Sequence, residues 1–152
     1  MAEEIIKIAS MKNNLSFELG YIDIRVDRAS VLGNPFELTN EDDRDKVSNA
    51  YKEWLYDQIN NPSNYSLDLA NWTNKGFKIA DKFKYPTSNQ VRKEISRLLN
   101  LIKQGNKLRL LCWCKEFDRE VQCHADSIKQ VLLSFCKMKY KQGYSEYTWT
   151  QY

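Results

Sequence analysis

The sequence predicts one α/β domain with a mostly parallel sheet and a β-rich N-terminal portion. Residues 107–135 contain an uninterrupted apolar run, a polar loop and then apolar residues at helical spacing, which indicates strand, loop and helix. A second amphipathic helix, expected over 88–104, leads directly into that strand. This order favours a crossover onto a parallel sheet with helices on both faces. We therefore expect a Rossmann-like three-layer sandwich formed by residues 1–152.

Length and composition fit one globular domain. The chain has 152 residues, 42% of them hydrophobic and 28% charged, which suffices for one core. The net charge of +3 neither indicates nor excludes a nucleic-acid partner. No apolar stretch approaches the ~20 residues of a membrane span, and the acidic N-terminus does not resemble a signal peptide. We expect a cytoplasmic protein without membrane association, with its cysteines as thiols or metal ligands.

The N-terminal third predicts three short strands and a tight turn. Residues 5–8 and 15–19 are β-type runs separated by a polar cluster, and 22–26 alternate apolar and polar residues. We expect a hairpin that leads into a third strand. In the following segment, 28–36, Pro35 disfavours a helical conformation for Asn34, so Gly33 is the predicted left-handed position.

Two helices are expected on either side of an irregular segment. Thr39 or Asn40 can cap the first helix, whose apolar stripe contains Val47, Ala50, Tyr51, Trp54 and Leu55. Ser88 or Asn89 can cap the second helix, which Gly105 ends.

The segment 60–89 lacks a clear periodicity and predicts either short hidden elements or an inserted loop or lid. Its lysines alternate with aromatic residues, which can bind single-stranded nucleic acid but more often form a solvated face. The aromatic tail, 140–152, could add an edge strand or form an interface.

Cysteines and the only histidine gather around the predicted strand end and the start of the next helix. Cys112 and Cys114 lie on one face of the strand, and Cys123 and His124 precede the helix. Ligands of open α/β sheets bind at this edge, beside unpaired N–H groups of the helix. We therefore expect a site here, with no cofactor favoured.

Three chemical interpretations of this cluster are open. Thiolates and an imidazole suit zinc, held by Cys112, Cys114, Cys123 and His124, although the C-x-C spacing is unusual for it. Cys123 at a helix N-terminus could be a reactive thiol. Alternatively His124 acts on a ligand with Asp126, although Asp126 and Ser127 also occupy positions where side chains cap a helix.

Four segments together resemble a known family. They are RASVLGNPF at 28–36, YKEWL at 51–55, LLCWC at 110–114 and CHAD at 123–126. In this order they resemble domain of unknown function 4326, a family of small domains found in phages and bacteria. Ala125 replaces the glycine typical of that family, and the loop 115–122 is longer. The resemblance implies a phage-type α/β domain and assigns no activity.

The leading hypothesis is a small nucleotide-like or phosphate-bearing ligand bound at the strand ends. If the protein is an enzyme, we expect chemistry at a nucleoside glycosidic bond, as in nucleoside hydrolases or deoxyribosyltransferases, with His124 and Asp126 as catalytic groups. The predicted ligand-binding residues are Arg28, Ser30, Gly33, Asn34, Cys112, Trp113, Cys114, Cys123 and Ser127. The alternative is a non-catalytic protein that binds a host protein or nucleic acid and contains the zinc site.

Overall fold

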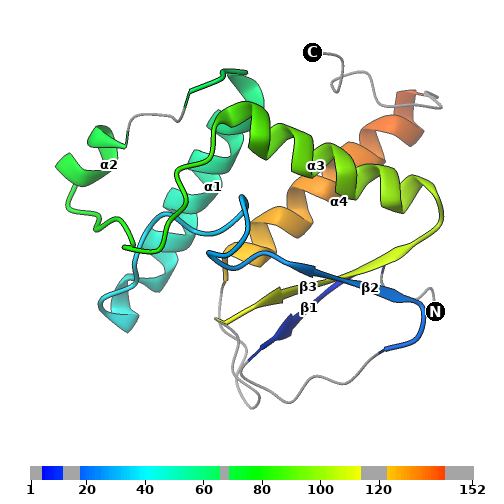
Figure 1. Cartoon of the computed structure of the whole chain (residues 1–152), viewed down its shortest axis with the longest axis horizontal. Coiled ribbons are helices and arrows are strands. Elements are labelled where there is room, and N and C mark those ends of the chain that lie inside the picture. The colour runs from blue at the N-terminus through cyan, green and yellow to red at the C-terminus, as the bar shows by residue number, and fades with distance from the viewer. Residues whose placement is uncertain (1–4, 12–17, 66–68, 114–122, 143–152) are drawn as a thin grey trace.

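The sheet contains three parallel strands, in the order β1-β3-β2 (Figure 1). The computed structural model describes residues 5–11, 18–65, 69–113 and 123–142. The strands are β1 (Ile6–Ser10), β2 (Tyr21–Arg25) and β3 (Lys107–Cys112). Leu108 of β3 lies opposite Ile6 of β1 and Ile22 of β2, so both edge strands run in register with the central one. The mostly parallel sheet predicted from the sequence is therefore confirmed.

The hairpin expected in the N-terminal portion is not seen in the part of the chain that the structure describes. β1 and β2 each pair with β3, in parallel. Glu18 and Leu19 lie in coil and turn, and residues 15–17 lie outside the described residues. β3 has the longest apolar run of the three strands, and a strand buried from both sides belongs at the centre of a parallel sheet. β3 therefore takes the central position, between β1 and β2.

Four α-helices occur among the described residues. They are α1 (Arg44–Asn60), preceded by the 3-10 helix η1 (Glu41–Asp43), α2 (Ala70–Asn74), α3 (Ser88–Lys103) and α4 (His124–Gln142). The side chain of Asn40 accepts a hydrogen bond from the Asp42 N–H, so the expected cap starts η1. Residues 143–152 of the expected tail lie outside the described residues. No described helix has both the length and the apolar character needed to span a bilayer.

The long helices α1, α3 and α4 all lie on one side of the sheet (Figure 1). The opposite face carries the charged row Lys7, Arg109 and Asp23, which are cross-strand neighbours. Arg109 donates to Asp23 from Nε at 2.6 Å, and Lys7 pairs with Glu18 at 2.5 Å. An apolar helix could not cover this row without burying its ion pairs. The second helical layer of the expected three-layer sandwich is thus not found among the described residues.

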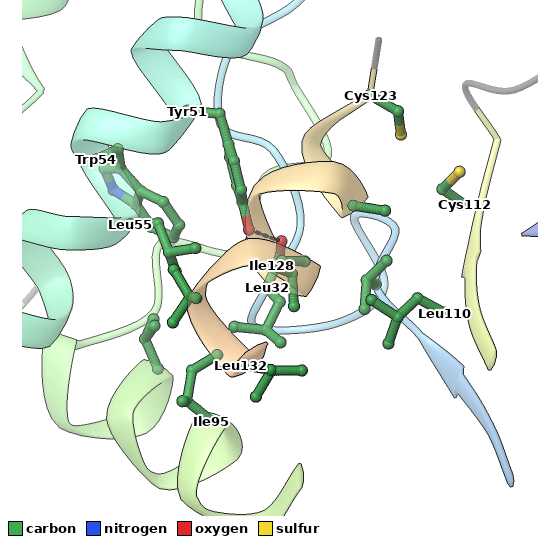
Figure 2. Packing of buried hydrophobic residues seen from close by; sticks show 14 of the residues in the cluster. Leu32, Tyr51, Trp54, Leu55, Ile95, Leu110, Cys112, Cys123, Ile128 and Leu132 are labelled. Carbon is green, nitrogen blue, oxygen red and sulfur yellow. Dashed lines mark hydrogen bonds between the residues drawn. The ribbon is translucent and has the colours of Figure 1, made fainter. Parts of the chain in front are cut away.

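The core lies between the helices and the sheet, and an aromatic stripe of α1 forms its centre (Figure 2). Tyr51, Trp54 and Leu55 are at most 1% exposed, as the helical spacing predicts. They pack with Ile95 of α3 and Ile128 of α4. Burying each of these side chains contributes about 1.5–3 kcal/mol relative to exposure, so α1 depends on this face.

The segment 60–89 contributes to the core through short elements. Trp72 of α2 and Phe83 are buried, and Ile79 forms an isolated antiparallel bridge with Phe36. Phe36 contacts the ring of Trp72 with centroids 5.6 Å apart. Most aromatic residues of the lysine-rich stretch therefore face inward, whereas Tyr85 is exposed.

The start of α3 corrects one expectation about capping. Thr87, rather than Ser88 or Asn89, is the N-cap: its hydroxyl accepts from the Gln90 N–H at 3.1 Å. The Gln90 side chain accepts from the Thr87 N–H at 2.9 Å, which completes a capping box. Ser88 is buried, and its hydroxyl donates instead to the carbonyl of Asn61. Thr87 and Ser88 both carry a hydroxyl group, so the sequence alone does not show which of them caps the helix and which bonds to another segment.

Thr87→Ala should destabilise the protein by about 1 kcal/mol, because the first turn of α3 loses a hydrogen-bond acceptor. The free energy of unfolding in urea measures this loss. Thr39→Ala, at an exposed position without a capping bond, is the matched control and should change stability little. Equal losses in the two variants would contradict the capping role.

Candidate functional site

A pocket of about 950 Å³ opens near the carboxyl ends of β2 and β3. The loop after β2, the beginnings of α1 and α4, and a short stretch around residue 83 form its walls. Its lining residues are Arg25, Asp27, Arg28, Ala29, Asn34, Phe36, Glu37, Leu38, Arg44, Val47, Ser48, Lys82, Lys84, Trp113, Cys123 and His124. This is the edge of a parallel sheet at which ligands bind in open α/β folds.

Arg28 holds the loop that forms one wall of the pocket. Its Nε donates to the Asn34 carbonyl at 2.8 Å, and one terminal nitrogen donates to the Phe36 carbonyl at 2.9 Å. The Asn34 side-chain oxygen accepts from the Phe36 N–H at 2.9 Å. Ser30 has a similar local role, since its hydroxyl accepts from the Leu32 N–H and it does not line the pocket. The loop is therefore fixed by its own polar groups.

Gly33 is required by close packing, and the expected left-handed conformation is wrong. The described glycines with positive φ are Gly20, Gly76 and Gly105. A Cβ atom on Gly33 would lie 2.6 Å from the Arg28 Cα and 2.7 Å from the Asp27 carbonyl oxygen. The glycine thus allows the loop to fold back on the backbone that carries Arg28.

His124 is buried at the start of α4, and both of its ring nitrogens have partners. Nε2 lies 2.5 Å from the Val26 carbonyl and donates to it, which leaves Nδ1 as an acceptor 3.6 Å from the Cys123 sulfur. The ring edge packs against Tyr51 at 5.1 Å between centroids. Burial lowers the pKa of His124 most, and although the Val26 bond raises it, the pKa stays below its ordinary value. The imidazole is therefore neutral at pH 7.

The two described cysteines of the cluster are reduced thiols near His124. Figure 2 shows the side chains of Cys112, from the end of β3, and Cys123, before α4, directed toward each other. The Cys112 thiol lies 3.9 Å from the Ala9 carbonyl. Cys114, the remaining residue of the expected zinc set, lies outside the described residues. Within the described ranges, no group of three or more His, Cys, Asp and Glu side chains could hold a metal ion.

Asp126 and Ser127 belong to the first turn of α4. The Asp126 carboxylate accepts from the Cys123 N–H at 2.9 Å, as an acidic residue at the third helical position does in a capping box. Neither residue lines the pocket. Asp126 therefore stabilises the helix start and does not present its carboxylate to a ligand in this arrangement.

Asp27 is a pocket residue that was not predicted from the sequence. It is 8% exposed and accepts from Arg25, at 2.5 Å to a terminal nitrogen, and from the Trp113 indole N–H at 3.0 Å. Burial raises the pKa of this carboxyl, but the hydrogen bonds from Arg25 and Trp113 lower it, and the net shift is downward. Asp27 is thus an ionised carboxylate. Its position directly after the strand predicted over 22–26 was the available signal.

The pocket is lined by five basic and two acidic side chains. Arg25 pairs with Asp27, and Arg44 pairs with Glu41. The second acid, Glu37, pairs with Lys78 at 3.0 Å. Arg28, Lys82 and Lys84, in contrast, form no ion pair with any described residue. The pocket therefore has an excess of positive charge.

The structure brings about half of the predicted site residues together. Arg28, Asn34, Trp113, Cys123 and His124 line the pocket. Among the described residues, those predicted for the site but not lining it are Ser30, Gly33, Cys112, Asp126 and Ser127. Arg25, Arg44 and Lys84 were missed as site residues because only the fold shows that their separate segments meet.

Residues 10–134 match the family model for a domain of unknown function, DUF4326. The chain belongs to this family. The matched region includes the whole lining of the pocket, so the pocket lies within the DUF4326 domain. A search of curated proteins found no match. A search of solved structures found none either.

Gly33→Ala should destabilise this DUF4326 domain by about 1–3 kcal/mol, because the new methyl group overlaps the Arg28 backbone. Urea unfolding measures the loss. Gly76→Ala is the comparison: that residue has φ +96° but nothing within 4 Å, so only backbone strain of about 1 kcal/mol is expected. A smaller loss at Gly33 than at Gly76 would refute the close-packing argument.

The free energy of unfolding should decrease as the pH falls below about 6.5, because His124 takes up a proton in the unfolded chain before it does in the fold. A lowered pKa in the folded protein means that this contribution is fully present above pH 6.5. The slope should approach about 1.4 kcal/mol per pH unit between the two pKa values. Chemical unfolding at several pH values between about 7.5 and 5.5 measures it. His124→Gln, which removes the only histidine, should be less stable and should lose this slope.

Proposed function

We propose that the protein binds a phosphate-bearing, nucleotide-like small molecule in the pocket at the carboxyl ends of β2 and β3. The observation that carries the proposal is the set of three cations, Arg28, Lys82 and Lys84, that line the pocket without a carboxylate partner in the described structure. Like charges that share a concave surface repel one another, and an anion removes that repulsion. A ligand with more than one negative charge fits this arrangement best.

Arg28 is suited to hold a phosphate group. Its two hydrogen bonds to the loop fix the guanidinium, so little side-chain freedom is lost when a ligand binds. Its remaining N–H donors are available for phosphate oxygens, which accept from such a fork in pairs. The Asn34 amide nitrogen, for which no protein partner is found among the described residues, adds a neutral donor beside it. The positive end of α4, at His124, adds to the attraction.

The proposal is limited to binding, because the expected acid and base do not face the pocket in a reactive form. Cleavage of a glycosidic bond needs a carboxyl or imidazole that can exchange a proton with the ligand. Asp126 caps α4, and His124 uses Nε2 for the Val26 carbonyl and Nδ1 for Cys123. Asp27 faces the pocket but is held by Arg25 and Trp113.

The lysine-rich stretch supports the same pocket rather than a nucleic-acid surface. Stacking of successive single-stranded bases needs several exposed aromatic rings, but in this stretch, residues 72–85, Tyr85 alone is exposed, while Trp72 and Phe83 are buried and Phe77 packs on Phe36. Lys82 and Lys84 line the pocket itself. A small anion therefore uses these charges better than a polymer does.

The double variant Lys82→Gln/Lys84→Gln should bind phosphate-bearing ligands about tenfold more weakly than the unmodified protein. Each exposed charge is expected to contribute about 0.7 kcal/mol. Isothermal titration calorimetry with pyrophosphate, ribose 5-phosphate and nucleoside 5′-monophosphates measures the dissociation constants. Both lysines are exposed, so the fold should be unaffected.

The matched control is Lys52→Gln/Lys93→Gln, which removes the same charge from exposed positions of α1 and α3 outside the pocket. It should change affinity less than twofold. The proposal fails if none of these compounds binds the unmodified protein, or if the two double variants lose affinity equally.

A further inference from the structure

Trp113 is a half-exposed indole in the lining of the pocket, directly after the end of β3. It is 48% exposed, whereas Trp54 and Trp72 are 1% and 8% exposed. An indole offers a large apolar face, and leaving half of it in water gives up part of the stabilisation that burial would provide. A ligand that covers this face would remove it from water and so gain the remaining stabilisation.

The orientation of the indole is fixed before any ligand arrives. Its N–H donates to Asp27 at 3.0 Å, and Asp27 is in turn held by the Nε of Arg25 at 3.1 Å and a terminal nitrogen at 2.5 Å. A charge-assisted bond to a buried carboxylate is strong, so the ring has little rotational freedom to lose on binding. Exposed aromatic rings held in this way are typical of stacking surfaces.

We propose that Trp113 stacks on an aromatic heterocycle of the ligand, so that the pocket selects nucleotides over other phosphate-bearing compounds. This inference rests on the proposed anion site, because the cations and the indole line the same pocket. Stacking of a base on an aromatic side chain is sequence-tolerant and substantial, and it grows with the area of the base. Purine nucleotides should therefore bind more tightly than pyrimidine nucleotides.

The pocket volume favours a nucleotide over a phosphotyrosine peptide, the other ligand class that combines a ring with phosphate. A volume of about 950 Å³ lies in the range of small-molecule sites. A peptide would need in addition an extended groove for its backbone. O-Phosphotyrosine is included in the test, and tighter binding of this compound than of adenosine 5′-monophosphate would overturn the nucleotide assignment.

The test compares adenosine 5′-monophosphate with ribose 5-phosphate, which has the same phosphate and sugar but no base. Calorimetry should show that the nucleotide binds the unmodified protein about tenfold more tightly. Trp113→Leu should abolish this difference and leave the affinity for ribose 5-phosphate within about twofold. Trp113→Phe, which keeps a ring but lacks the bond to Asp27, should retain part of the preference. Tyr65→Leu, at an exposed aromatic residue outside the pocket, is the control.

Each result separates the indole from the anion site. If the two compounds bind equally, or if Trp113→Leu weakens both to the same extent, base stacking is refuted while the anion site stands. If neither compound binds, the anion site and the stacking inference both fail. Thermal unfolding of each variant confirms that a loss of affinity does not reflect a loss of fold.

Discussion

The pocket depends on one buried hydrogen bond, from Nε2 of His124 to the carbonyl of Val26. This bond joins the start of α4 to the chain that leaves β2. The N–H of Val26 donates to the carbonyl of Leu111 at 3.0 Å, so the same residue also ties that chain to β3. Two strand ends and a helix start are thereby held together. Because burial keeps the imidazole neutral, its N–H is a donor without the cost of a buried charge.

The loop after β2 is held by side chains rather than by regular secondary structure. The Tyr51 hydroxyl donates to the Leu32 carbonyl at 2.7 Å, and Arg28 donates to two further carbonyls of the loop. Burial raises the pKa of Tyr51, so its hydroxyl stays protonated and remains a hydrogen-bond donor. Buried backbone groups outside helices and strands need such partners. Arg28 therefore serves the fold with two of its donors and can serve a ligand with the others.

The periodicity of apolar residues predicted the helices and strands well. It could not predict contacts between segments that are distant in the sequence. The stripe of α1, the run of β3 and the helix begun by His124 follow from residue spacing alone. The Gly33-Asn34-Pro35 sequence predicts a turn. It does not show that the absence of a side chain at Gly33 makes room for the Arg28 backbone. Asp27 was overlooked because its partner Trp113 is 86 positions away. The central place of β3 between β1 and β2 was also beyond what periodicity predicts, because β3 lies far along the chain from both strands.

The positive charge of the pocket is specific to that surface rather than a consequence of composition, since the chain as a whole has a charge of only +3. On the polar face of the sheet, Arg109 is matched by Asp23 and Lys7 by Glu18. On the helices, Arg97 is matched by Glu94. Around the pocket, in contrast, Arg28, Lys82 and Lys84 line one cavity and none of them has an acidic partner in the described structure. Three cations that share one concave surface repel one another, and this repulsion is the physical argument behind the proposed anionic ligand.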